Sequence, residues 1–315
     1  MRRNLKVSIR SFLLSLLVTL TLHAAAQQQS VSSKPQPNVI LGVLEDHAGI
    51  YSGDPYFRVV RAVFQRYGNE WRPFPNDCSN PQCLKSFPKS YPQEVNWTIA
   101  FDGRDLGRVK ARTPADFRFY SQVGIEEITY FGAIPTVGKR AREYGGFTGD
   151  PVYRPLVAVS SPNFKDPDEW KHAQLSQQQI DTARLLFRSK FPIASNCKNP
   201  DENKLKAWNY LDGDIKIQSA YSSSNGWSLI ELALTGYACD GPTDDDGPFD
   251  GQWYATAPSG KIRFLGSNMW LVDAGDYDGD GKSEVLFAVD GYDLGGYRLF
   301  YRDFSRSSEF LFSYH

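Results

Sequence analysis

The sequence predicts a mostly β protein, with propeller-like antiparallel four-stranded blades in the C-terminal part and one amphipathic helix near 177–190. Short runs rich in β-branched and aromatic residues, separated by turn residues, indicate strands along most of the chain. After about residue 205 these runs become regularly spaced, and one earlier stretch has helical periodicity. With 315 residues, the chain can bury a large core in one domain or two.

Residues 1–26 have the layout of a secretory signal peptide. Four basic residues precede or begin an apolar run at 11–22, and small residues offer a cleavage site after Ala26. The apolar run is too short for a good membrane span, and an uncleaved anchor is the alternative. We therefore expect a secreted or periplasmic protein with no membrane span after signal cleavage. The basic residues are Arg2, Arg3, Lys6 and Arg10.

The composition of the chain after the signal argues against a nucleic-acid partner. Removing the four basic residues of the signal from the 35 Lys and Arg leaves 31, against 36 Asp and Glu, which gives a formal charge of −5. Nucleic-acid binding requires a basic surface. Residues 27–37 are polar and contain prolines, so we expect a flexible lead-in before an N-terminal β-rich region at 38–204.

The four cysteines predict disulfide bonds, because an even number of cysteines in an exported chain is typical of disulfide pairing. Four cysteines allow three connectivities. We favour Cys78–Cys83, which closes a short loop, together with Cys197–Cys239; buried free thiols are the alternative. Zinc is not indicated, because the chain has no second close pair of cysteines and few histidines.

The N-terminal region at 38–204 contains two predicted hairpins and one predicted buried strand. Residues 56–74 carry strand-forming residues around the turn Gly68-Asn69. Residues 95–112 have the same organisation around Asp102-Gly103, and residues 154–160 form an apolar run typical of a buried strand.

The predicted helix lies within residues 175–192. Ser176 and Gln179 form a capping box, and Pro192 follows the expected end. Apolar residues at helical spacing place one stripe against the core; they are Ile180, Ala183, Phe187 and Phe191.

The C-terminal region at 205–315 contains two predicted sets of four strands, each set about 45–55 residues long. This period suits propeller blades. The two sets resemble each other in pattern and only weakly in sequence. The expected strands are 214–221, 227–238, 252–257 and 261–266, followed by 269–274, 283–292, 295–304 and 308–315.

Between the first two strands of the second set lies an acidic, glycine-containing loop. Counting Asp276 as position 1 places Asp278 at position 3, Asp280 at 5, Lys282 at 7 and Glu284 at 9. Calcium prefers about six to eight oxygen ligands, and alternating side chains of a curled loop can all point inward. The carbonyl of Lys282 would add an oxygen while its side chain points outward. The loop therefore predicts a Ca²⁺ site.

The spacing of this loop excludes an EF-hand. An EF-hand requires a bidentate glutamate at position 12 and helices on both sides. Position 12 here is Phe287, inside a strand-like run, and the last carboxylate comes early, at Glu284. The pattern indicates a metal site between two strands. The alternative is an acidic turn that binds nothing, in which the converging carboxylates would repel each other.

The run "AGDYDGDGKSEVLFAV", residues 274–289, resembles the repeat motif of FG-GAP/VCBS-type proteins, which is related to the calcium loops of integrin alpha-chain propellers. In that family a strand leads into a Gly-Asp-x-Asx-x-Asp-Gly loop, and a carboxylate opens the next strand. The resemblance covers about residues 269–313 and implies calcium between the first two strands of a blade. Family members usually have several such loops, whereas this chain has one. The residues that match ligand positions are Asp276, Asp278, Asp280 and Glu284.

Other polar clusters give weaker indications. The run 239–251 has five aspartates without the alternating spacing, so we expect a solvated acidic loop, with a second metal site as the alternative. Glu45, Asp46 and His47 are adjacent and suggest general acid–base chemistry, but a turn at a strand end is the favoured interpretation.

The sequence favours a non-catalytic binding or scaffolding module whose partner is an extracellular protein or a glycan. The chain contains no Gly-x-Ser-x-Gly elbow, no His-Glu-x-x-His motif and no phosphate-binding loop. The alternative is a secreted carbohydrate-active enzyme or lectin that uses acidic and aromatic residues. Seven tryptophans could stack on sugars, although we expect most of them in the core.

Overall fold

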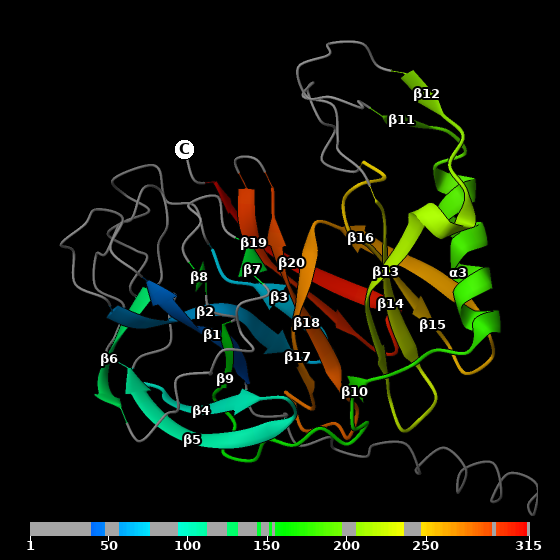
Figure 1. Cartoon of the computed structure of the whole chain (residues 1–315). Coiled ribbons are helices and arrows are strands. Elements are labelled where there is room, and N and C mark those ends of the chain that lie inside the picture. Colours follow the sequence, from blue (N-terminus) through cyan, green and yellow to red (C-terminus); the bar gives the residue numbers. More distant parts are fainter. Residues whose placement is uncertain are drawn as a thin grey trace, which may run out of the picture. The chain divides into compact units, whose positions relative to one another are not determined.

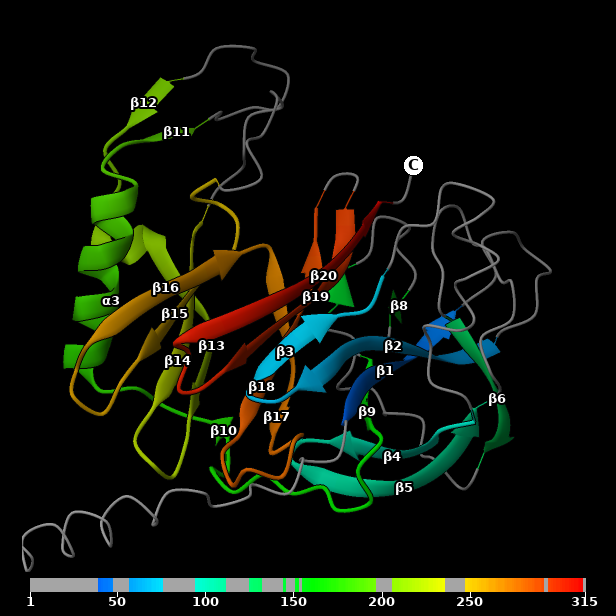
Figure 2. The same ribbon diagram turned by 180° about the vertical axis from the view of Figure 1, so that it is seen from behind.

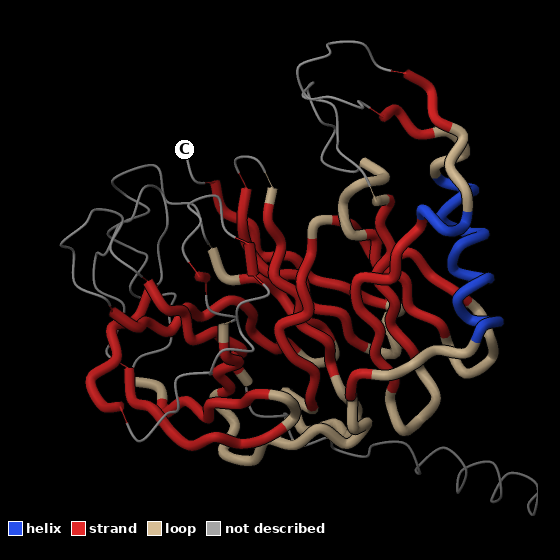
Figure 3. The backbone as a smooth tube through the Cα atoms, in the orientation of Figure 1, coloured by secondary structure: helices blue, strands red, loops and turns tan. Residues whose placement is uncertain are grey.

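Antiparallel sheets make up most of the computed structural model, with the strands in red and a helix in blue in Figure 3. The described residues all belong to the unit Asn38–His315. The predicted signal, the lead-in at 27–37, the four cysteines and most of the acidic run 239–251 lie outside the described residues. The described residues are 39–47, 57–75, 94–111, 125–131, 144–145, 151–152, 155–196, 206–235, 247–291 and 294–313.

The first sheet has seven strands and contains most of the N-terminal region (Figure 1). Its order is β1-β9-β4-β5-β6-β2-β3, and β2 also pairs with β1, so the pairings return to the strand at which they start. All of these pairings are antiparallel. The strands are β1 (Ile40–His47), β2 (Phe57–Tyr67), β3 (Glu70–Pro73), β4 (Asn96–Phe101), β5 (Arg104–Ala111), β6 (Ile125–Phe131) and β9 (Leu156–Val159).

Two further sheets contain the strands of the C-terminal region. The five-stranded sheet has the order β10-β13-β14-β15-β16, and the four-stranded sheet has the order β17-β18-β19-β20. In both, strands that follow each other along the chain are also neighbours in space. The bounds are β10 (Lys171–His172), β13 (Ile215–Ser222), β14 (Ser228–Leu234), β15 (Gln252–Thr256), β16 (Ile262–Ser267), β17 (Met269–Gly275), β18 (Glu284–Asp290), β19 (Leu294–Tyr301) and β20 (Arg306–Ser313).

Short elements complete the described part of the chain. Two small antiparallel pairs are β7 (Tyr144–Gly145) with β8 (Pro151–Val152), and β11 (Ala194–Asn196) with β12 (Lys206–Trp208). A single turn of 3₁₀ helix, η2, spans Asp212–Asp214.

The helix α3 spans Gln177–Lys190, where the sequence predicts it. Its predicted capping box is confirmed: the Gln179 backbone N–H donates to Ser176 Oγ, and the Ser176 N–H donates to Gln179 Oε1 at 2.9 Å. Ala183 and Phe187 are buried and pack with residues of β14 and β15. No helix of the described residues combines the length and the apolar character that a bilayer crossing requires.

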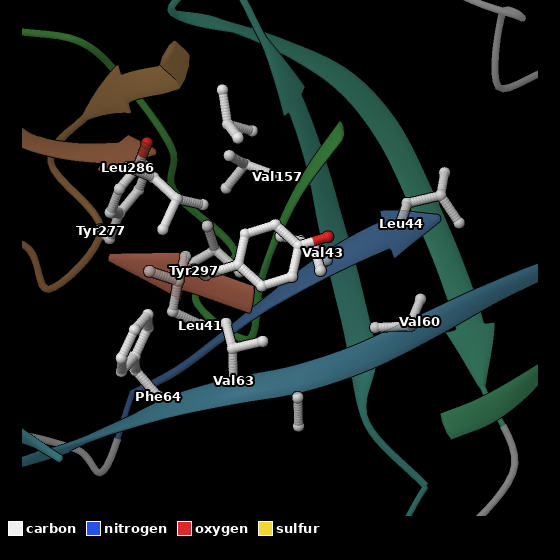
Figure 4. Close-up of a cluster of buried hydrophobic side chains, with 14 of the residues drawn as sticks. Leu41, Val43, Leu44, Val60, Val63, Phe64, Val157, Tyr277, Leu286 and Tyr297 are labelled. Atoms are coloured by element: carbon white, nitrogen blue, oxygen red, sulfur yellow. The ribbon is translucent and has the colours of Figure 1, made fainter. Parts of the chain in front are cut away.

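The largest core cluster joins the seven-stranded sheet to one face of the four-stranded sheet. In Figure 4, side chains of β1, β2 and β9 meet Leu286, Tyr297 and Tyr277. Figure 2 shows β3 beside β20, which are in contact. The cluster therefore contains residues of both the predicted N-terminal region at 38–204 and the predicted C-terminal region at 205–315.

The opposite face of the four-stranded sheet packs on the five-stranded sheet. Successive strand residues point to opposite faces, so Leu286 belongs to the first cluster and Phe287 to a second one with Trp253. A third cluster lies between the far face of the five-stranded sheet and α3. The four-stranded sheet is thus buried on both sides, which explains the continuous apolar run of β18.

The predicted hairpins are confirmed. β2 and β3 pair around Gly68-Asn69, and β4 and β5 pair around Asp102-Gly103. The predicted buried strand corresponds to β9, in which all four residues are buried. The eight strands predicted after position 205 correspond to β13 through β20, with ends that shift by a few residues.

Candidate metal centre

The acidic loop connects β17 to β18 and brings three carboxylates together. Gly275 at the end of β17 pairs with Glu284 at the start of β18, so the strand ladder closes the base of the loop. Oxygens of Asp276, Asp278 and Glu284 lie within 4.8 Å of one another. These residues are only 3%, 6% and 3% exposed. The loop therefore forms a compact, buried set of oxygen donors.

Backbone N–H groups hold these carboxylates in place. Asp276 Oδ2 accepts from Gly281 N at 3.0 Å, and Asp278 Oδ1 accepts from Asp280 N at 3.0 Å. Glu284 Oε2 accepts from Tyr277 N at 2.9 Å. The chain can curl this tightly because Gly281 has φ +90°, a conformation that residues with a Cβ rarely adopt.

One carboxylate oxygen in the set has no partner among the described residues. Asp276 Oδ1 is buried and forms no hydrogen bond. A buried acceptor without a partner costs free energy, because it has lost its water. The geometry thus leaves a strong oxygen acceptor without a hydrogen bond on one of three neighbouring carboxylates, an environment that a hard cation would satisfy.

A buried arginine from the seven-stranded sheet approaches the same group. Arg66 Nε lies 2.7 Å from Asp278 Oδ2, with the Arg66 side chain 5% exposed and the Asp278 side chain 1% exposed. The contact is an ion pair whose angles do not meet those of a hydrogen bond. Arg66 therefore neutralises one of the three carboxylates.

The pKa values of all three carboxyl groups are raised. Burial raises the pKa of Glu284 well above its usual range, and the charges of Asp278 and its neighbours raise it further. Burial also raises the pKa of Asp276, against the hydrogen bond from Gly281. For Asp278, burial raises the pKa and Arg66 opposes that rise. Without a cation, the group resists full ionisation.

Of the other two predicted metal residues, Asp280 lies outside this buried group, and Lys282 was expected to contribute its carbonyl with its side chain pointing outward. Asp280 is exposed, and its Oδ1 accepts from the backbone N–H of Lys282 at 2.9 Å. The Lys282 side chain points away and pairs with Asp303 at 2.7 Å. That pairing raises the pKa of Lys282.

A segment that the sequence analysis did not connect with the loop covers its outer side. We call residues 163–170 the covering segment. Asp168 Oδ2 accepts from Ser283 N at 2.9 Å, and Asp166 Oδ1 accepts from Ser283 Oγ at 2.5 Å. Asp168 Oδ1 also accepts from Asn225 Nδ2 at 2.8 Å, in the turn between β13 and β14. The covering segment thus ties the acidic loop to the neighbouring sheet.

The base of the loop packs directly against this covering segment. The Asp276 N–H donates to the carbonyl of Lys165 at 2.9 Å, and Phe164 stacks on Tyr277 with ring centroids 5.9 Å apart. A Cβ on Gly275 would lie 2.4 Å from the Phe164 ring, so a larger residue there would require that ring to move. Tyr277 is fully buried and points into the core (Figure 4).

Arg66, Asp166 and Asp168 are the residues that sequence reasoning missed. Arg66 lies near the end of a largely buried strand, and nothing in its local sequence distinguishes it. The alternating Asp166 and Asp168 offered a signal, because the same spacing occurs at Asp276 and Asp278. Because Asp166 and Asp168 are far from Ser283 in the chain, no local sequence pattern predicted this association.

The weaker candidates have structural explanations. Glu45 accepts two hydrogen bonds from Arg61, at 2.8 and 2.9 Å, and one from Tyr297 at 2.8 Å, so its carboxylate is held between two sheets. In the run 239–251, Asp250 Oδ2 accepts from Gly247 N within its own turn. All seven tryptophans are described, and each is buried or half-buried. The side chains of Asp46 and His47 lie outside the described part.

Comparisons with known proteins identify no relative. No protein-family model matches this chain, and neither a curated protein nor a solved structure matches it.

Proposed function

We propose that this protein binds calcium in the loop 276–284 and acts outside the cytoplasm as a non-catalytic binding or scaffolding module for an extracellular protein or glycan. The observation that supports the metal most strongly is the buried, unpartnered Oδ1 of Asp276 within a group of three carboxylates. The buried charge of this group provides a second argument: three carboxylates and one guanidinium sum to two negative charges, which a divalent cation would neutralise.

The donor set favours calcium over other divalent ions. Zinc prefers sulfur and nitrogen ligands, and the group contains neither. Magnesium demands a small octahedral site and retains several waters, whereas calcium accepts six to eight oxygens from a flexible loop. A curled loop that brings three carboxylates together suits calcium.

The strand arrangement supports propeller-like blades in the C-terminal part. The four-stranded sheet β17–β20 is an antiparallel meander packed face to face on the meander β13–β16. The metal loop connects the first two strands of its sheet, as the FG-GAP/VCBS resemblance implies. The turn between the first two strands of the preceding sheet, at Asn225, reaches the same covering segment.

A structural role for the ion follows from the enclosure of its ligands. Catalytic metal sites keep a ligand position open to water or substrate. Here the three carboxylates are at most 6% exposed and lie between elements of different sheets. We therefore propose that the ion stabilises the packing of the sheets, and that partners bind elsewhere.

The affinity expected of such a site agrees with the predicted export. Calcium modules outside cells typically bind with Kd values of ~10⁻⁴–10⁻³ M. At ~1 mM calcium and a Kd of ~0.1 mM, binding stabilises the fold by about 1.4 kcal/mol. This occupancy requires a calcium-rich environment, to which a secretory signal at 1–26 would export the protein.

Thermal unfolding in calcium and in chelator tests the proposal. We expect calcium to raise the Tm by roughly 3 °C, from the free energy above and the size of the chain. Asp276→Asn should abolish this shift, and Asp181→Asn, on the exposed side of α3, should preserve it. An identical Tm in calcium and chelator would contradict the assignment of the metal.

A further inference from the structure

Arg66 is held firmly beside the candidate metal site by the seven-stranded sheet. It belongs to β2, and its backbone N–H donates to the carbonyl of Val39 at 2.9 Å. Its guanidinium lies over the ring of Trp71, at 5.7 Å from the ring centroid. The side chain is 5% exposed, so water screens its charge little. Arg66 is therefore a fixed positive charge, placed within contact distance of one metal-site carboxylate.

The Arg66 guanidinium thus contributes one positive charge beside Asp278. Lys282, the other nearby cation, is exposed and paired with Asp303. Three buried carboxylates and the Arg66 guanidinium leave two negative charges in the buried part of the site. Asp166, Asp168 and Asp280 add negative charge at the rim, where solvent screens part of it.

We propose that Arg66 is the residue that sets the charge selectivity of the metal site, favouring divalent over trivalent cations. This proposal rests on calcium binding at the same loop. Repulsion between the guanidinium and a bound ion grows with the ion's charge, so a trivalent ion is penalised more than a divalent one. Arg66 also occupies the surroundings of Asp278 Oδ2 and so limits how that carboxylate can turn toward an ion.

Paired affinities for Ca²⁺ and Tb³⁺ test this inference. They are measured by titration of the metal-free protein, for the wild type and for Arg66→Met, which keeps the length of the side chain without its charge. We expect Arg66→Met to bind both ions more tightly and to raise the Tb³⁺/Ca²⁺ affinity ratio by about tenfold. Arg66→Lys retains the charge and should keep the ratio within about threefold of the wild type.

Matched variants separate charge from structural damage. Arg108→Met removes an exposed arginine elsewhere and should leave the ratio unchanged. If Arg66→Met fails to fold, Arg66→Gln replaces it, because glutamine is uncharged but polar.

The outcomes distinguish the inference from the proposed function. If the wild-type protein binds neither ion, the result contradicts the calcium site itself and therefore also this inference. Binding in the wild type with an unchanged Tb³⁺/Ca²⁺ ratio in the uncharged Arg66 variant would overturn the role of Arg66 and leave calcium binding intact.

Discussion

Arg66 Nε and Asp278 Oδ2 lie 2.7 Å apart in a buried ion pair that connects the seven-stranded sheet to the metal loop. Two charges that have both lost water stabilise each other only as a pair. Among the described residues no ion pair involves Asp276, two residues earlier, and its Oδ1 forms no hydrogen bond. The two aspartates therefore have different roles in the metal-free protein, although the sequence pattern makes them equivalent.

Isosteric variants should reveal this difference. Asp276→Asn should abolish stabilisation by calcium and leave the free energy of unfolding in chelator unchanged or higher, because it removes like-charge repulsion. Asp278→Asn should also abolish the calcium effect and lower stability in chelator by about 3 kcal/mol, because Arg66 stays buried without its partner. Urea unfolding with and without calcium measures both quantities.

Asp280→Asn is the matched control for these variants. Asp280 is exposed and outside the buried group, so its substitution should preserve most of the calcium response. A loss as complete as that of Asp276→Asn would show that Asp280 turns inward to ligate the ion, as the alternating sequence pattern predicts.

The metal-free protein should become less stable relative to Asp276→Asn as pH rises. Raised pKa values mean that the folded state holds protons more tightly than the unfolded state. The associated stability is fully present below the ordinary carboxyl pKa values, near 4, and is lost as pH rises through the raised values. Chelator-treated wild type and variant, unfolded in urea at several values between pH 5 and pH 8, provide the comparison.

Calcium should reverse this trend, since protons and the ion compete for the same oxygens. The gain in unfolding free energy on adding calcium should therefore increase from pH 5 to pH 8. A gain that is constant over this range would mean that the three carboxyl groups are already ionised in the metal-free fold.

Removing the covering segment's contact with the loop should weaken calcium binding without touching a ligand. Asp168 accepts hydrogen bonds from Ser283 N and Asn225 Nδ2, at 2.9 and 2.8 Å. Residues that orient metal ligands typically contribute about 10–100-fold to affinity. We expect Asp168→Ala to raise the Kd for calcium at least about tenfold, measured by calorimetric titration. Asp181→Ala, on α3, is the control, and equal affinities for both variants would exclude this positioning role.

Glu231 gives a prediction that is independent of the metal. It lies in β14 opposite Ser219 of β13, and burial raises its pKa from 4.5 to about 7, against a hydrogen bond from Ser219. The associated stability is present below pH 4.5 and lost as pH rises through 7, a difference of about 3 kcal/mol at about 1.4 kcal/mol per pH unit. Glu231→Gln should therefore raise the Tm at pH 8 and change it little at pH 4.

The control for this substitution is Glu94→Gln, which changes an exposed glutamate. It should leave the Tm unaltered at both pH values. An equal effect of Glu231→Gln at pH 4 and pH 8 would show that packing, and not charge burial, determines the result.

Local patterns in the sequence predicted α3, the hairpins β2–β3 and β4–β5, the buried strand β9 and the eight strands β13 to β20, but not β1, β6 or the short pairs. The capping box at Ser176 defines the start of α3, and turn residues such as Gly68 define the hairpins. The alternation of Asp276 and Asp278 indicates the candidate metal loop, because the carboxylates that the structure brings together are close in the chain. These features depend on interactions between near neighbours, which a single sequence contains.

Long-range relationships could not be predicted in this way. The pairing of β1 with both β2 and β9 closes the first sheet, and no local pattern specifies the partners of a strand. Arg66 reaches Asp278 only because two sheets pack together. The exposure of Asp280 depends on how tightly the loop curls, which the hydrogen bond from Gly281 to Asp276 determines.

Isothermal titration of calcium into the metal-free protein tests the loop most directly. We predict one bound Ca²⁺ per chain with a Kd of ~10⁻⁴–10⁻³ M, and no detectable binding in Asp276→Asn. The absence of binding heat and of any change in Tm at ~10 mM calcium, about tenfold above the weakest Kd expected, would contradict the proposed calcium site.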